Sequence, residues 1–164
     1  MRECRYVPMK NSPLNLVLCQ VRFTALRKIS EYVPSIQEAF RQNGYPIENA
    51  GKVQQLTLSH TKGIESTEEE RWEYRNKTET RSILVHQNSV VLQVTDYERF
   101  EDFAEHLSLA VRTVLETTEH DKFGLIQRVG LRYVDTIVPK AERDYRFYLR
   151  PGLHGISKND FQKG

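Results

Sequence analysis

The clearest hydrophobic pattern in the chain lies near its N-terminus. Residues 14–24, LNLVLCQVRFT, follow Pro13 and are rich in apolar and β-favouring side chains. The first half of this segment is apolar on both faces, which is typical of a strand inside a sheet. Residues 30–46 then repeat apolar side chains at helical spacing and reach Gly44, so they predict an amphipathic helix that stops at this glycine.

Four further segments have the alternation and composition of strands: 53–61, 72–78, 80–87 and 89–97. The polar and acidic segment KGIESTEEER at 62–71 predicts a turn between the first two. Because these strands follow one another closely, antiparallel pairing is favoured.

The strongest helical stripe covers residues 98–119, and a long strand is predicted at 125–138. The resulting order, β-α-β-β-β-β-α-β, predicts an α+β fold: a mainly antiparallel sheet with two helices on one face. Two plans fit this order. One is a ferredoxin-like arrangement with an extra hairpin. The other is a TATA-binding-like or GyrI-like β-α-β4-α module followed by one more strand.

Length and composition add limits to this picture. We expect one domain over residues 1–138, and residues 139–164, which include Pro139 and Pro151, to form a C-terminal extension. A net charge of +2 does not indicate a nucleic-acid partner. No apolar stretch is long enough for a membrane span. Cys4 and Cys19 make no disulfide framework, so a reducing, cytoplasmic location is predicted.

The segment RVGLRYVD at 128–135 holds the candidate ligand site. Strand alternation puts Arg128, Gly130 and Arg132 on one face, and Val129, Leu131 and Tyr133 on the other. We expect the second set to lie under the helices, which places both arginines, with Arg22, on the open face. There they would bind an anionic group or simply pair with neighbouring carboxylates. The second alternative is favoured.

An uncovered apolar sheet face predicts a partner. The expected interface residues are Leu16, Leu18, Ile126 and Val134. A second copy of the chain, another protein or the 139–164 extension would cover them. Nucleic acid is possible but not favoured, because the overall charge is near neutral.

Catalytic chemistry has little support in the sequence, so we lean towards a protein that is not an enzyme. The five histidines are scattered, and no metal, cofactor or catalytic site is predicted. His106 falls on the polar side of the second helix, where a solvated side chain is expected. Glu116 and His120 are four residues apart, which favours a helix-surface pair over a metal site.

Four stretches together resemble a sporadically distributed bacterial family of uncharacterised proteins. They are SPLNLVLCQVRF at 12–23, SEYVPSIQEAFRQNGYP at 30–46, TDYERFEDFAEHL at 95–107 and RVGLRYVD at 128–135. Members of that family look longer than this chain, so the resemblance implies that the chain corresponds to their N-terminal part, and that the missing C-terminal half is a further candidate to cover the open sheet face. It implies no agreed activity and suggests an accessory or interaction role, linked to mobile or defence-related gene neighbourhoods.

Overall fold

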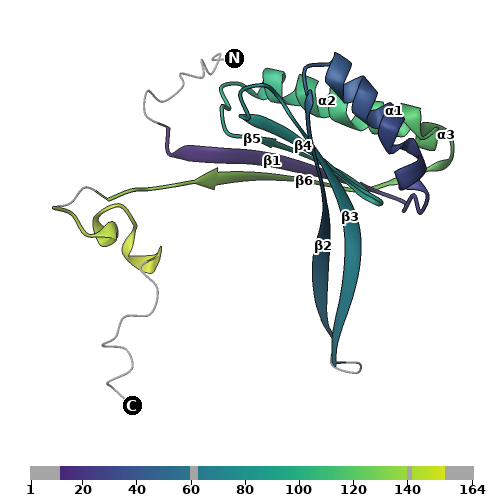
Figure 1. Ribbon diagram of the computed structural model, residues 1–164. Helices are drawn as coiled ribbons and strands as arrows, with labels where there is room; N and C mark the ends of the chain where they lie inside the picture. Colours follow the sequence, from purple (N-terminus) through teal and green to yellow (C-terminus); the bar gives the residue numbers. More distant parts are fainter. Residues whose placement is uncertain (1–11, 60–62, 140–141, 154–164) are drawn as a thin grey trace, which may run out of the picture. The chain divides into compact units, whose positions relative to one another are not determined.

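The computed structural model describes residues 12–59, 63–139 and 142–153. The strands are β1 (Leu14–Phe23), β2 (Ile47–Ser59), β3 (Gly63–Arg75), β4 (Arg81–His86), β5 (Ser89–Val94) and β6 (Ile126–Asp135). The helices are α1 (Ile29–Gln42), α2 (Phe100–Thr117) and the short α3 (His120–Phe123), with 3-10 turns η1 (Tyr145–Phe147) and η2 (Pro151–Leu153) (Figure 1).

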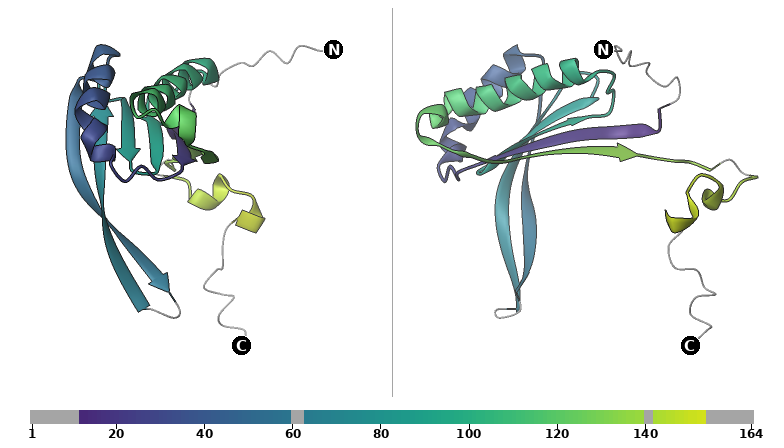
Figure 2. Two further views of the ribbon diagram at one scale, coloured as in Figure 1. Left: turned by 90° about the vertical axis from the view of Figure 1, so that its right-hand side faces the viewer. Right: turned by 180° about the vertical axis from the view of Figure 1, so that it is seen from behind.

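The described strands form one antiparallel sheet in the order β2-β3-β4-β5-β1-β6. Helix α1 connects β1 to β2, and α2 connects β5 to β6, so both long connections return to the same face of the sheet (Figure 2). The α+β fold and the predicted element order are therefore confirmed. The order suits both plans: β3–β4 is the extra hairpin of the first, and β6 is the added strand of the second.

The hydrophobic core lies between the two long helices and four of the strands. The buried residues are Val17, Cys19, Val21 and Phe23 on β1, Trp72 and Tyr74 on β3, Ile83 and Val85 on β4, Val90, Leu92 and Val94 on β5, with Ile29, Ile36, Phe40, Tyr45, Phe103, Ala110 and Val114. Cys19 is a small buried hydrophobe, as expected, and burial raises the pKa of its thiol.

One predicted turn is wrong. Residues 62–71 were expected to reverse the chain, but β3 begins at Gly63 and pairs with β2 from Ser59↔Gly63 to Ile47↔Arg75. Strand β4 pairs only with Trp72 to Arg75. The acidic segment therefore belongs to a two-stranded ribbon, where a backbone ladder forms without an alternating apolar pattern. The turn was predicted wrongly because the prediction used only the polarity of this segment.

The predicted stop of the first helix is confirmed at Gly44. Its φ of 90° is left-handed, which a residue with a side chain rarely adopts. The Tyr45 N–H donates to the Phe40 carbonyl at 2.9 Å and closes the helix end. This turn fixes the position of Tyr45 directly after the helix.

The described residues fall into two compact units: a first unit within 14–134, and a second unit made of 12–13, 135–139 and 142–153. In the second unit, the Thr136 N–H donates to the Pro13 carbonyl at 2.7 Å. Farther along, the Arg143 guanidinium carbon lies 4.2 Å from the Phe147 ring centre, and Phe147 packs edge-on against Tyr148. Cys4 lies outside the described residues.

Gly124 gives a direct test of the packing around α3. A Cβ at this position would overlap the His120 ring, which packs on Phe23 with ring centres 5.3 Å apart and bonds Thr24 Oγ1 at 2.9 Å. We predict that Gly124→Ala lowers the free energy of unfolding by roughly 1–3 kcal/mol. Gly51→Ala is the control, because a Cβ there meets nothing within 4 Å. Denaturant titration measures both, and equal stability of the two variants would contradict the packing.

Candidate functional site

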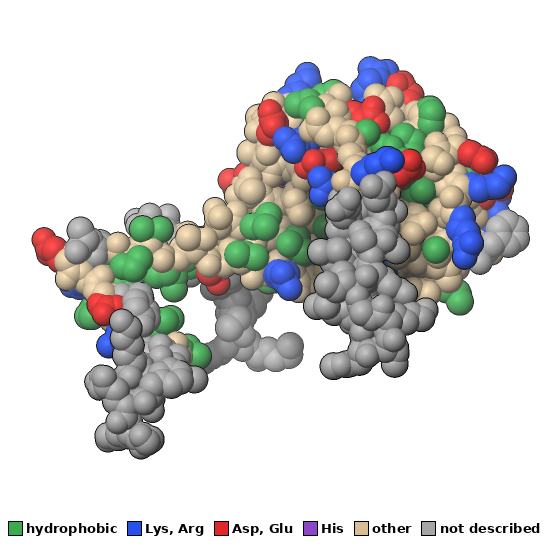
Figure 3. Space-filling model, turned by 60° about the horizontal axis from the view of Figure 1, so that its bottom comes forward, with side chains coloured by type: hydrophobic (Ala, Val, Ile, Leu, Met, Phe, Trp, Pro, Cys, Tyr) green, Lys and Arg blue, Asp and Glu red, His purple; other side chains and the backbone are tan. Residues whose placement is uncertain are grey.

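The edge strand β6 exposes several large apolar side chains, whereas the apolar side chains of β1, β4 and β5 are buried or half-buried. Ile126 is 56% exposed, Val129 62%, Leu131 45% and Tyr133 46%. None of the four belongs to the core cluster or to the partly buried side chains packed against it. With the bottom of the Figure 1 view turned forward, hydrophobic side chains lie on a part of the surface with few charges, and most charged side chains lie towards the upper and right edges of the view (Figure 3).

This exposure overturns one expectation. Val129, Leu131 and Tyr133 were predicted to be buried under the helices, but all three are exposed. Only the Tyr133 ring reaches the helix side, where it lies edge-on 5.8 Å from the ring of Tyr97, which packs on Phe103 of α2. Arg128 and Arg132 were assigned to the open face because their neighbours on β6 were expected under the helices. That the two arginines share a face with Arg22 therefore stays a prediction.

The structure brings the three candidate arginines onto neighbouring strands. Arg22 lies on β1 and is exposed between the buried Val21 and Phe23, so it points away from the helices. Arg128 and Arg132 are exposed on β6, the strand beside β1. Among the described residues, none of the three forms an ion pair or hydrogen bond. Arg41, Arg75 and Arg81, by contrast, each pair with a carboxylate.

The predicted interface residues differ in how much surface they offer. Leu16, Leu18 and Val134 are half-buried, and Ile126 is exposed. Leu84 on β4 and Val91 on β5 alternate with core residues and so belong to the open face. They lie outside the core cluster, yet only 8% and 9% of their surface is exposed. The middle of the open face is thus largely covered by its own neighbours. The apolar surface that remains is concentrated on β6.

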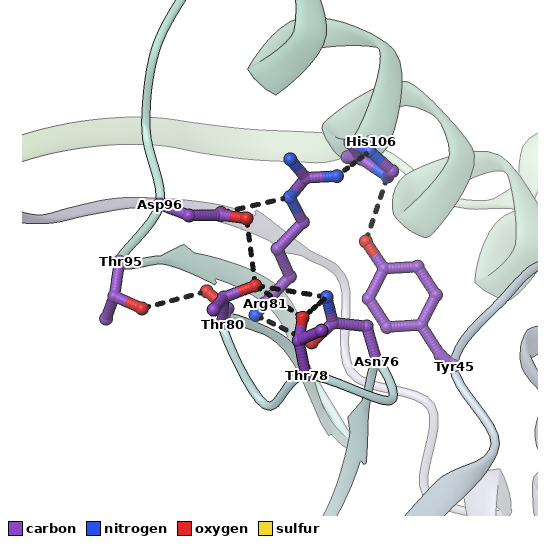
Figure 4. Close-up of polar contacts among 8 residues, drawn as sticks. All are labelled: Tyr45, Asn76, Thr78, Thr80, Arg81, Thr95, Asp96 and His106. Atoms are coloured by element: carbon purple, nitrogen blue, oxygen red, sulfur yellow. Dashed lines mark hydrogen bonds and ion pairs between the residues drawn. The ribbon is translucent and has the colours of Figure 1, made fainter.

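A second cluster, which the sequence did not reveal, joins the helices to the sheet (Figure 4). Tyr45 Oη lies 2.9 Å from His106 Nδ1. Arg81 Nη1 lies 2.8 Å from His106 Nε2, and Arg81 Nε donates to Asp96 Oδ1 at 3.2 Å. Thr80 Oγ1 donates to Asp96 Oδ2 at 2.9 Å. These contacts tie α2 to β4 and to the end of α1.

The partners of His106 determine its protonation state. A guanidinium group has no acceptor, so Arg81 must donate to Nε2, which therefore carries no proton. The neutral ring then holds its proton on Nδ1 and donates it to Tyr45 Oη. The expectation of a solvated His106 is wrong, because this ring is half-buried and bonded at both nitrogens.

Burial and charge both act on this cluster. Burial, and then Arg81, lower the pKa of His106, against the smaller opposing effects of Asp96, Glu105 and Asp102. Burial raises the pKa of Tyr45 to about 12. A cavity of about 170 Å³ beside the cluster is lined by residues that include Arg81, Arg99, Asp96, Glu98 and Asp102. The charges of the side chains that line the cavity nearly cancel, and His106 holds its proton in the bond to Tyr45. We interpret the cluster as a structural joint.

Sequence reasoning had one signal for this joint: Tyr45 stands directly after the helix stop. The partners Arg81 and His106 are 36 and 61 residues farther along the chain, and no local pattern connects them. His120 was expected on a helix surface near Glu116, but it begins α3 and bonds Thr24 instead.

Among the described residues, no three His, Cys, Asp or Glu side chains are grouped to hold a metal ion. In the same part of the chain, no helix combines the length and apolarity needed to cross a membrane. Comparison with known proteins gave no match among family models, curated proteins or solved structures. The resemblance based on the four sequence stretches therefore stays a prediction.

The joint predicts a pH-dependent stability. Because the folded state lowers the pKa of His106 below its usual 6.5, the unfolded chain binds more protons at this residue as the pH falls through that range. The free energy of unfolding should therefore decrease as the pH is lowered from about 7 to about 5. Denaturant midpoints across this range measure the slope.

The His106→Gln variant isolates the contribution of this residue. Its amide oxygen still accepts from Arg81, but it does not titrate, so its stability should fall less steeply with acid. Identical slopes for the wild type and the variant would show that His106 does not carry the effect.

Proposed function

We propose that the chain is a non-enzymatic protein-interaction module that self-associates through the exposed edge strand β6. The observation that supports this proposal is the row of large apolar side chains on a strand that, within the part of the chain the structure describes, pairs on one side only. An edge strand presents backbone N–H and C=O groups to a further strand. An accessory role in the bacterial cytoplasm, without a cofactor, is part of the proposal.

The size of the apolar contribution indicates what else the interface needs. Burying four side chains that are already half-covered contributes on the order of 4 kcal/mol. Association costs on the order of 4–15 kcal/mol in lost freedom of motion. Apolar contact on β6 is therefore insufficient by itself. A stable pair must add backbone hydrogen bonds along the strand and favourable charge contacts.

The interface can be tested by the mass of the protein in solution. We predict that the wild type sediments as a dimer, and that the Val129→Lys/Leu131→Lys variant shifts to the monomer, because lysine at these exposed sites opposes burial without disturbing the core. Ser35→Lys is the control, since Ser35 is an exposed residue of α1. A wild type that stays monomeric, or a β6 variant that keeps the dimer mass, would refute the proposal.

A second candidate function is binding of an anionic ligand or nucleic acid through Arg22, Arg128 and Arg132. The observation in its favour is that none of these arginines has an acidic partner among the described residues. We predict for this candidate that single-stranded oligonucleotides bind with an affinity that falls steeply as salt increases.

Fluorescence anisotropy with labelled oligonucleotides measures that binding. Arg128→Ala/Arg132→Ala should abolish it, while Arg112→Ala, an exposed arginine on α2, should not. Unchanged binding in the double variant would eliminate the arginine site.

A further inference from the structure

We infer that the β6 strands of two copies of the chain pair antiparallel across a twofold axis, with Leu131 of one copy directly opposite Leu131 of the other. The inference rests on the proposed self-association and specifies how the second copy occupies β6. It follows from three features of residues 128–134: the side of the sheet on which the apolar row lies, the order of its side chains and the positions of the arginines.

The apolar row of β6 faces the helix side of the sheet. The Tyr133 ring lies 5.8 Å from the ring of Tyr97, which packs on Phe103 of α2. Leu131 and Val129 precede Tyr133 by two and four residues, so strand alternation assigns them to the same side. All three are exposed. The row therefore continues from the core to an edge at which, within the described residues, no further strand pairs.

A twofold axis beside Leu131 pairs this row with itself. An axis perpendicular to the sheet joins two identical edges antiparallel and keeps the helices of both copies on the same side. In this register, Val129 of each copy lies opposite Tyr133 of the other. Directly opposite residues share a face, with Cβ atoms about 5 Å apart, and aromatic with β-branched pairs are stabilising. Six apolar side chains thus cover one another between the helices of the two copies.

The arginines exclude the neighbouring register. A Cβ on Gly130 would lie 3.9 Å from Nε and Nη2 of Arg128, so these two residues share a face, and alternation adds Arg132. If Gly130 lay opposite Gly130, Arg128 of each copy would directly face Arg132 of the other, which is destabilising. With Leu131 at the axis, Arg132 faces Gly130 of the other copy instead. Arg128 then faces Val134, and dissolved ions screen the remaining diagonal repulsion.

Other registers are mismatched as well. A pairing centred on Arg132 or Arg128 places two identical arginines directly opposite each other. A pairing centred on Val129 leaves Leu131 facing Gln127. The Leu131 register alone among these matches apolar with apolar side chains and keeps the arginines from facing each other. It also joins residues 128–134 of both copies in one ladder, which supplies the backbone hydrogen bonds that apolar contact on β6 lacks.

Single cysteines on β6 report the register. Leu131→Cys, in a Cys4→Ser background, should form a disulfide-linked dimer under mild oxidation at least about tenfold faster than Ser35→Cys on the exposed surface of α1. Its two Cα atoms lie about 4.5–5.5 Å apart across the axis, within the range of a disulfide. The native Cys19 is buried and stays in place.

Val129→Cys and Gly130→Cys are the matched controls for this register. Across the axis, the two copies of residue 129 are offset by four positions along the strands, about 13 Å, and those of residue 130 by two positions, about 7 Å. Both offsets place the Cα atoms beyond the range of a disulfide. Neither variant should therefore cross-link faster than Ser35→Cys.

A charge at Gly130 gives a second measurement. Gly130→Glu places a carboxylate opposite Arg132 of the other copy in two equivalent positions, so sedimentation should show a dissociation constant at least about threefold lower. Gly130→Lys should raise the constant by a similar factor. Both side chains have room, because a Cβ here meets only the Arg128 side chain within 4 Å. Equal effects of Glu and Lys would contradict the register.

The outcomes separate this inference from the proposed function. Suppose that Val129→Lys/Leu131→Lys dissociates the dimer, but Leu131→Cys does not cross-link faster than Val129→Cys, Gly130→Cys and Ser35→Cys. The register would then be overturned, and self-association through β6 would stand. A protein that is monomeric at all concentrations would overturn both, as would a dimer that no β6 variant affects.

Discussion

Two helices side by side can cover only part of one face of this sheet, and the exposed surface follows from that limit. Packed helices lie about 10 Å apart, so a pair shields about 20 Å. Six strands at a spacing of about 4.8 Å span about 24 Å between the first and last axes. The core accordingly takes its strand residues from β1, β3, β4 and β5. Strand β6 lies at the edge beyond this cover and keeps its apolar side chains exposed.

The helix layer is held to the sheet by apolar packing and by one polar joint. Tyr45 and Asp96 lie in two connections, Arg81 on strand β4 and His106 on helix α2, and their bonds form a continuous chain from the end of α1 to β4 and α2. Only one tautomer of a neutral histidine can accept from a guanidinium and donate to a phenol, so this pair of bonds requires one orientation of the His106 ring. The joint thus fixes where the helices lie, and hence which strands they leave uncovered.

The sequence predicted the element order well because local patterns determine it. The strand pattern at 14–24, the helical stripe at 98–119 and the stop at Gly44 need no knowledge of distant partners. Two features could not be read this way. The acidic strand 63–71 lacks an apolar face, so its pairing with β2 leaves no periodic signal. The exposure of Val129, Leu131 and Tyr133 depends on how far two helices extend across a sheet, which composition does not reveal. The tertiary contacts of His106 were missed for the same reason.

Amide hydrogen exchange of β6, followed by mass spectrometry at protein concentrations above and below the association midpoint, tests the central claim most directly. If β6 is an uncovered edge that a second copy occupies, amides in 126–134 exchange more slowly at the higher concentration, while core strands β4 and β5 exchange equally slowly at both. Exchange from β6 that is independent of concentration would contradict the account.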